Sequence, residues 1–192
     1  KSERGYLTQI EVETLMNWEL DKKLEQTRDV FIFCCFTGLS YIDVFKLTRE
    51  QIQLSIDGQL WIMGKREKTD MDYFIPMMEI PKKILEKYKN QTFKNGKILP
   101  VKTSVMVNRH LKEIAKVCGI EKHLTFHLSR HTFATLTMSK GVSLESVSKM
   151  LGHKNIRTTQ IYAKMTTEKV GRDMAIFAES IKETERKFVV NF

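Results

Sequence analysis

The chain is poor in cysteine, in proline and in long apolar stretches. Its 192 residues include 3 cysteines and 3 prolines, and the cysteines have no C-x-x-C or zinc-like spacing. We therefore expect reduced thiols in the core, and neither disulfides nor a structural metal site. The longest apolar run, Val30 to Phe36, is far shorter than the ~20 residues that span a bilayer, and no signal peptide opens the sequence. These absences predict a cytoplasmic protein with no membrane partner.

Negative charge is also in short supply. The 23 acidic residues are outnumbered by 32 lysines and arginines, which leaves a formal net charge of +9 at pH 7. The basic residues are spread along the chain, a distribution that suits a broad surface facing phosphates better than a disordered basic arm. Hydrophobic content of 42% and charged content of 29% are typical of one folded domain of this length. The charge thus indicates a polyanionic partner without choosing a function.

Most of the sequence has helical signals. The capping-box pattern from Thr8 to Glu11 predicts a first helix after a linker end at residues 1–9. An all-round apolar segment from Thr27 to Thr37, ended by Gly38, predicts a buried central helix. Four further helices are expected, from Pro81 to Tyr88, from a Ser104 cap to Cys118, from Ser129 to Ser139 and from a Ser143 cap to Leu151.

A short antiparallel meander interrupts the helices. Ile52, Leu54 and Ile56 alternate as a half-buried strand, and Asp57-Gly58 is a hairpin signal. A second strand from Leu60 to Met63 and a third from Tyr73 to Ile75 flank a charged turn at residues 64–70. The predicted fold class is therefore mainly α with a small three-stranded antiparallel sheet, within a single domain over residues 1–192.

The residues with the strongest chemical signal lie between positions 127 and 162. His127 and Arg130 are three apart, a helical spacing that puts imidazole and guanidinium on one face. Leu151-Gly152-His153 predicts a tight turn, and Tyr162 follows nine residues after His153 on a short helix. Each piece alone is weak, but in this order two imidazoles, a guanidinium and a phenol can surround one phosphate.

This ordered set resembles the catalytic core of the tyrosine recombinases, the phage-integrase family, over roughly residues 37–164. The resemblance implies that Tyr162 is the nucleophile, that His127 accepts or relays its proton, and that Arg130 and His153 stabilise the phosphate oxygens. The family places a catalytic lysine in the charged hairpin. Its usual spacing to the following proline selects Lys68, with Lys65 as the alternative.

The sequence departs from the family pattern at one position. Thr37-Gly38-Leu39 is followed by Ser40, where the family usually has the first of two phosphate-binding arginines. Asp43 matches the acidic position three residues further on, which is expected to support the catalytic groups by hydrogen bonds. A neutral hydroxyl supplies no charge, so another cation is needed. Arg28 and Arg66 are the candidates, and a slow enzyme or a site completed only in a larger complex are the alternatives.

The function implied by the resemblance is site-specific DNA recombination, integration or excision, through a covalent 3′-phosphotyrosine intermediate. It implies double-stranded DNA as partner, no cofactor, no metal and no ATP, and a homotetramer on DNA in the full-length protein. It further implies action at the bacterial nucleoid and a separate DNA-gripping domain that is absent from this chain. The missing arginine favours a mobile-element integrase over a chromosome-dimer resolvase.

Three rival functions stay open on the sequence. They are strand relaxation of the type IB topoisomerase kind, non-catalytic DNA binding by a helical domain, and a role in protein interaction or structure. The C-terminal helix and tail at residues 168–192 carry an apolar stripe. They are expected either to pack on their own domain or to dock onto a neighbouring protomer.

Overall fold

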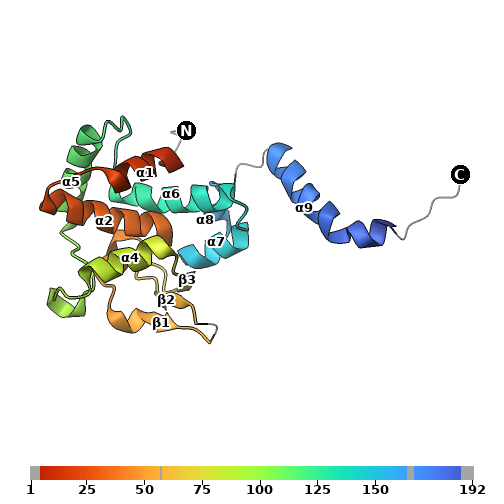
Figure 1. Ribbon diagram of the computed structural model, residues 1–192. Coiled ribbons are helices and arrows are strands. Elements are labelled where there is room, and N and C mark those ends of the chain that lie inside the picture. The colour runs from red at the N-terminus through yellow and green to blue at the C-terminus, as the bar shows by residue number, and fades with distance from the viewer. Residues whose placement is uncertain (1–4, 57, 164–166, 187–192) are drawn as a thin grey trace, which may run out of the picture. The chain divides into compact units, whose positions relative to one another are not determined.

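The expected central helix lies in the middle of the fold as α2 (Lys22–Thr37), shown among its neighbours in Figure 1 of the computed structural model. It starts earlier than predicted because the Asp21 side chain accepts hydrogen bonds from the first backbone amides. Gly38 ends it at φ +70°, as predicted. A Cβ at Gly38 would lie 2.5 Å from the Phe133 ring, so both the backbone angle and the packing require glycine here. The structure describes residues 5–56, 58–163 and 167–186.

Four helices pack around α2: α1 (Gln9–Asn17), α4 (Glu79–Tyr88), α5 (Ser104–Val117) and α6 (Phe126–Ser139). The Thr8 capping box that was predicted for α1 is present, and α5 buries Val107, Leu111 and Ile114. The predicted starts of α4, α5 and α6 were wrong. Helix α4 begins at Glu79, two residues before Pro81. Thr103, not Ser104, caps α5. Helix α6 begins at Phe126, so His127 lies inside the helix and Arg130 follows its first turn.

Short elements connect these helices. They are α3 (Tyr41–Phe45), η1 (Arg49–Gln51), η2 (Lys94–Gly96), α7 (Leu144–Leu151) and α8 (Arg157–Gln160). Ser143 caps α7 as predicted, and Gly152 ends it in the left-handed conformation. Tyr162 lies in the turn after α8 and packs against a small apolar cluster from α6 and α7.

The sheet is the predicted antiparallel meander, in the order β1 (Ile52–Leu54), β2 (Leu60–Lys65), β3 (Asp72–Pro76). Ile62 pairs with Ile75, and both are buried in the main core. The expectation of a half-buried first strand was wrong, since Leu54 is 69% exposed and Ile56 lies beyond the strand, fully exposed. β1 is only three residues long and lies at the edge of the sheet. Of its side chains, Ile52 packs against the main core. Asp57 of the predicted turn lies outside the described residues.

Two compact units make up the chain, Lys1–Tyr162 and Ala163–Phe192. The second contains α9 (Thr167–Arg186), whose Met174, Ile176 and Phe177 side chains are half or more exposed. The apolar tail expected at residues 188–192 lies outside the described residues. Among the described helices, none combines the length and the apolar character that crossing a membrane requires.

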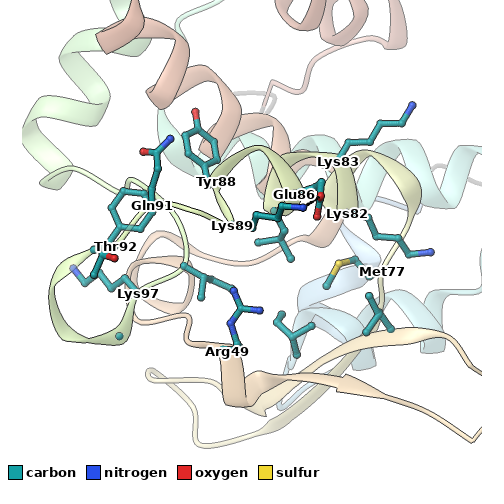
Figure 2. Close-up of a pocket in the computed structure, with 16 residues that line it drawn as sticks. Arg49, Met77, Lys82, Lys83, Glu86, Tyr88, Lys89, Gln91, Thr92 and Lys97 are labelled. Carbon is teal, nitrogen blue, oxygen red and sulfur yellow. Dashed lines mark hydrogen bonds and ion pairs between the residues drawn. The ribbon is translucent and has the colours of Figure 1, made fainter.

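A surface pocket of about 760 Å³ lies between α4, the η2 segment and the sheet (Figure 2). Its wall is apolar, from residues such as Leu60, Met77 and Phe93, and cations including Arg49, Lys82 and Lys97 stand around it. Because none of the sequence-predicted site residues lines this pocket, the candidate chemistry lies elsewhere in the molecule.

Candidate active site

Arg130 joins three segments that are far apart in the sequence. It lies on α6 with only 4% of its surface exposed. Its Nη1 donates to the Gly38 carbonyl at the end of α2, at 2.6 Å, and its Nη2 donates to the Leu151 carbonyl at the end of α7. The guanidinium therefore satisfies two helix-terminal carbonyls that would otherwise be buried without partners. Burial, with Arg66 nearby, lowers the pKa of Arg130 to about 9, so the group remains cationic at neutral pH.

Asp43 holds a second buried cation in place. Its Oδ2 accepts a hydrogen bond from the Ser40 hydroxyl at 2.5 Å and forms an ion pair with Nη1 of Arg66. Ser40 and Asp43 also form the capping box of α3. Arg66 follows β2, in the first turn of the charged hairpin, and its side chain is 9% exposed. The serine at the usual arginine position and the hairpin arginine thus converge on one carboxylate oxygen.

Arg66 lies directly against the Gly152 turn. A Cβ on Gly152 would come within 2.5 Å of the Arg66 Cγ, so only glycine leaves room for this side chain. The Thr69 hydroxyl of the same hairpin donates to the Gly152 carbonyl at 3.2 Å. Within the part of the chain that the structure describes, the buried Nε of Arg66 has no hydrogen-bond acceptor. Arg66 therefore has an unsatisfied buried donor beside the turn that carries His153.

His153 is half-buried and held by the residues that follow it. Its Nδ1 forms a 2.8 Å hydrogen bond with the hydroxyl of buried Thr159. Burial, together with the positive charges of Arg130 and Arg66, lowers the pKa of His153 to about 4. At neutral pH the ring is therefore uncharged and has one N–H to donate.

The phenol of Tyr162 reaches the same region. Its hydroxyl forms a 2.5 Å hydrogen bond with Nδ1 of His131, and the two rings lie 5.2 Å apart. The electrostatic coupling between Arg130 and Tyr162 shows that the phenol also lies near the buried guanidinium. The nucleophile candidate is half-buried and anchored at its oxygen.

Several predicted site residues are therefore neighbours, although they come from different elements. The structure brings together Ser40, Asp43, Arg66, Arg130, His153 and Tyr162. Lys65 ends β2, and Lys68 lies in the hairpin turn, both exposed. His127 is exposed on α6, one turn before His131, with its ring centroid 4.4 Å from that of His131.

Arg28 does not lie where a replacement for the missing active-site arginine has to lie. It lies in the first half of α2, about 15 Å of helical rise before Gly38. Its Nη1 donates to the carbonyls of Leu15, Met16 and Trp18, and its Nε pairs with Asp29. Arg28 thus caps the C-terminal end of α1, and the suggestion that it replaces the missing active-site arginine is corrected.

Two residues of this region were not singled out in the sequence. Thr159 holds the His153 ring, and His131 holds the Tyr162 hydroxyl. A signal for His131 was present, because it lies four residues after His127 on the same helical face and directly follows Arg130. Thr159 stands in a polar stretch with no comparable signal.

The centre as a whole has the charge that suits an anion. Two buried guanidinium groups face one carboxylate, with a neutral imidazole beside them. This leaves a net positive charge in a region with little solvent to screen it. A phosphate diester carries the complementary single negative charge.

Comparison with known proteins agrees with this geometry. The model of the phage integrase family matches residues 5–169. The chain is 34% identical over 143 residues to the tyrosine recombinase XerD of Listeria innocua, covering 68% of this chain and 47% of the relative. It is 29% identical over 186 residues to XerD of Oceanobacillus iheyensis, covering 88% and 60%. The chain belongs to the phage integrase family, and it spans about half the length of the curated relatives that it matches.

Solved structures share the fold. The crystal structure of XerA recombinase superposes with a TM-score of 0.70 at 22% identity, over 99% of this chain and 68% of that one. XerH recombinase bound to a palindromic difH substrate gives 0.71 at 21% identity, over 92% and 54%. The Tn1549 transposon integrase bound to circular intermediate DNA gives 0.67 at 21% identity, over 91% and 67%. The predicted fold class, mainly helical with a small antiparallel sheet, is confirmed.

Proposed function

We propose that this chain is the catalytic part of a tyrosine recombinase that cuts and rejoins double-stranded DNA at specific sites, as integration or excision requires. The observation that carries the proposal is the convergence of Arg66, Arg130 and His153, with the phenol of Tyr162 close to Arg130. These groups provide what phosphoryl transfer without a bound metal needs, which is fixed positive charge around the phosphorus and a positioned nucleophile.

The proposed reaction is a transesterification. The Tyr162 oxygen attacks the scissile phosphorus, a 3′-phosphotyrosyl bond forms, and the bond to the 5′ oxygen breaks. Lys68, on the exposed hairpin, protonates the departing 5′ oxygen. Arg130, Arg66 and His153 stabilise the non-bridging oxygens as negative charge develops on them. Because the phosphotyrosyl bond preserves the phosphodiester energy, rejoining needs no ATP.

Arg66 takes the place of the arginine that Ser40 replaces. Its buried position, its ion pair with Asp43 and its unpaired Nε support this role. Asp43 keeps the guanidinium aimed at the Gly152–His153 turn, while Ser40 fixes the carboxylate through the capping box. The cation comes from a neighbouring segment but serves the same phosphate.

Substitution of the nucleophile tests this proposal. A pool of nicked duplexes with a randomised core is incubated with the chain, and DNA that stays bound to protein in detergent is sequenced to find the cleaved site. We expect wild type to give a covalent adduct and Tyr162→Phe to give none, while the DNA affinity of the two proteins is equal. Adduct that still accumulates with Tyr162→Phe would show that another residue attacks.

The proposed partners are two DNA duplexes and three further copies of the chain in the full-length protein, acting in the bacterial cytoplasm at the nucleoid. The exposed Met174, Ile176 and Phe177 of α9 offer apolar side chains for docking between protomers. Light scattering on the DNA-bound protein measures this assembly. A stable tetramer that persists after all three residues are changed to serine would exclude the α9 contact.

A further inference from the structure

The base that receives the Tyr162 proton can be identified from the hydrogen bonds of the phenol. A phenol is a poor nucleophile at neutral pH, since its ordinary pKa is about 10. It needs a base in direct contact. Nδ1 of His131 lies 2.5 Å from the Tyr162 oxygen, well within the reach that proton transfer requires.

We infer that His131 accepts the proton of Tyr162 as the phenol attacks DNA, an inference that rests on the proposed recombinase function. The phenol can donate to Nδ1 only when that nitrogen carries a lone pair, so the active imidazole has its proton on Nε2. His131 touches the reacting oxygen itself and is therefore a catalytic residue.

The environment of His131 suits this task. The residue is 6% exposed, so its ring has a fixed orientation and water does not compete for Nδ1. It lies on α6 directly after Arg130, so one helix presents both the base and the buried cation. His127 lies one turn earlier, and its ring meets that of His131 at 86°. His127 is exposed, so the histidine of this pair that contacts the phenol is the buried one.

The proton balance of the step is complete. The O–H bond of Tyr162 breaks, an N–H bond forms on Nδ1, and the phenolic oxygen bonds to phosphorus. The leaving 5′ oxygen takes a proton from Lys68, which becomes a neutral amine. In the rejoining reaction the attacking 5′ hydroxyl returns a proton to Lys68, and His131 returns its proton to the phenolic oxygen.

Replacing the leaving 5′ oxygen by sulfur distinguishes the loss of the proposed base, His131, from the loss of the proposed acid, Lys68. The site recovered from the randomised pool is synthesised with either oxygen or sulfur at the bridging 5′ position of the scissile phosphate, and sulfur leaves without protonation. His131→Asn keeps a hydrogen-bond acceptor near the position of Nδ1 but cannot take a proton. The matched control is His123→Asn, because His123 is exposed on the loop before α6.

We expect His131→Asn to slow single-turnover adduct formation by about 10²- to 10⁴-fold on both substrates, the range of general acid–base catalysis. His123→Asn should match wild type. A rate within about threefold of wild type, or recovery of the His131→Asn rate by the sulfur substrate, would overturn the assignment.

A second variant guards against a folding defect. His131→Ala leaves space for a small base, and we expect dissolved imidazole to raise its rate of adduct formation, whereas imidazole should not affect wild type. Circular dichroism and DNA affinity confirm that both variants fold. Folded variants that keep the wild-type rate would refute only the role of His131 and leave the recombinase function standing. Absence of adduct from the wild-type protein would refute both.

Discussion

At the scale of single residues, Asp43 decides where the positive charge of the site lies. Its carboxylate is buried and accepts from both Ser40 and Arg66. A buried carboxylate next to two buried guanidinium groups is stable only while its own partner stays in place. The position of the Arg66 charge is therefore tied to its ion pair with Asp43, and residue 40 affects this pair through its own contact with Asp43.

The proposal that Arg66 replaces the arginine usually found at position 40 is testable. We expect Arg66→Ala to lower the rate of covalent adduct formation by about 10²- to 10³-fold, because a guanidinium that contacts the transition state is lost. Ser40→Arg alone should at least preserve the wild-type cleavage rate. Added to Arg66→Ala, it should raise the rate of that variant at least about tenfold. It also removes the cap of α3, which costs about 1 kcal/mol of folding stability.

Arg49→Ala is the control for this series, because Arg49 is an exposed cation beside the surface pocket and not in the site. Rates are measured on the recovered site under single-turnover conditions. If Arg66→Ala and Arg49→Ala react equally fast, Arg66 has no part in the chemistry.

A site residue could be predicted from the sequence when its spacing to other site residues indicated its role. Arg130, His153 and Tyr162 were singled out because their order and spacing are visible in the sequence. The contact between Arg66 and Asp43 joins residues 23 apart and forms only when the hairpin folds back on α3. Arg28 was a candidate for its charge, but its three carbonyl partners at the end of α1 come within reach only in the folded chain.

At the scale of elements, the turn that ends α7 positions both a carbonyl and an imidazole. Gly152 adopts φ +58°, and its carbonyl is held by Thr69. The next residue, His153, donates its backbone N–H to the Ser148 carbonyl at 3.1 Å. The helix end thus fixes His153 by its backbone on one side and by Thr159 on the other.

A methyl group on this turn should damage both folding and activity. We expect Gly152→Ala to lower the free energy of unfolding by roughly 2–4 kcal/mol, because left-handed strain adds to the overlap with Arg66. Gly119→Ala is the matched control, since Gly119 has φ +67° and open space around it, and should lose only about 1 kcal/mol. Urea unfolding measures both, and equal losses would mean that Arg66 does not pack on the turn.

Some boundary predictions succeeded because the cap is local. Thr8, Gly38 and Ser143 act within their own turns, and the helix ends that they bound were correctly placed, whereas the local caps Asp21 and Thr103 were missed. The start of α6 was missed because Thr125 makes no side-chain cap. Instead, the Asn108 side chain on α5 accepts from the Phe126 amide at 2.9 Å, a cap that comes from another helix.

At the scale of the whole molecule, the buried positive charges affect the response of stability to pH. The pKa of folded His153 is about 4, below its ordinary value of 6.5. As the pH falls from about 6.5 towards 4, the unfolded chain therefore takes up a proton that the folded chain refuses. The stability contributed by neutral His153 is present above this range and is lost across it.

We expect acidification from pH 7 to pH 4.5 to lower the melting temperature of wild type by a few degrees more than that of His153→Gln. Because the ring is only half-buried, solvent screens the effect, and about 1 kcal/mol is expected, or roughly 2–4 °C for a chain of this size. His123→Gln serves as the control and should follow wild type. Parallel curves for wild type and His153→Gln would show that the folded ring accepts a proton normally.

The shared carboxylate of Asp43 has a consequence for how such enzymes diverge. Ser40 and Arg66 contact the same oxygen of Asp43, so under the role proposed for Arg66 a lineage can pass through an ancestor with arginine at both positions and then discard either one. Each generation along that path would keep a guanidinium for the phosphate. Surveys that score each position separately would then classify active descendants as defective.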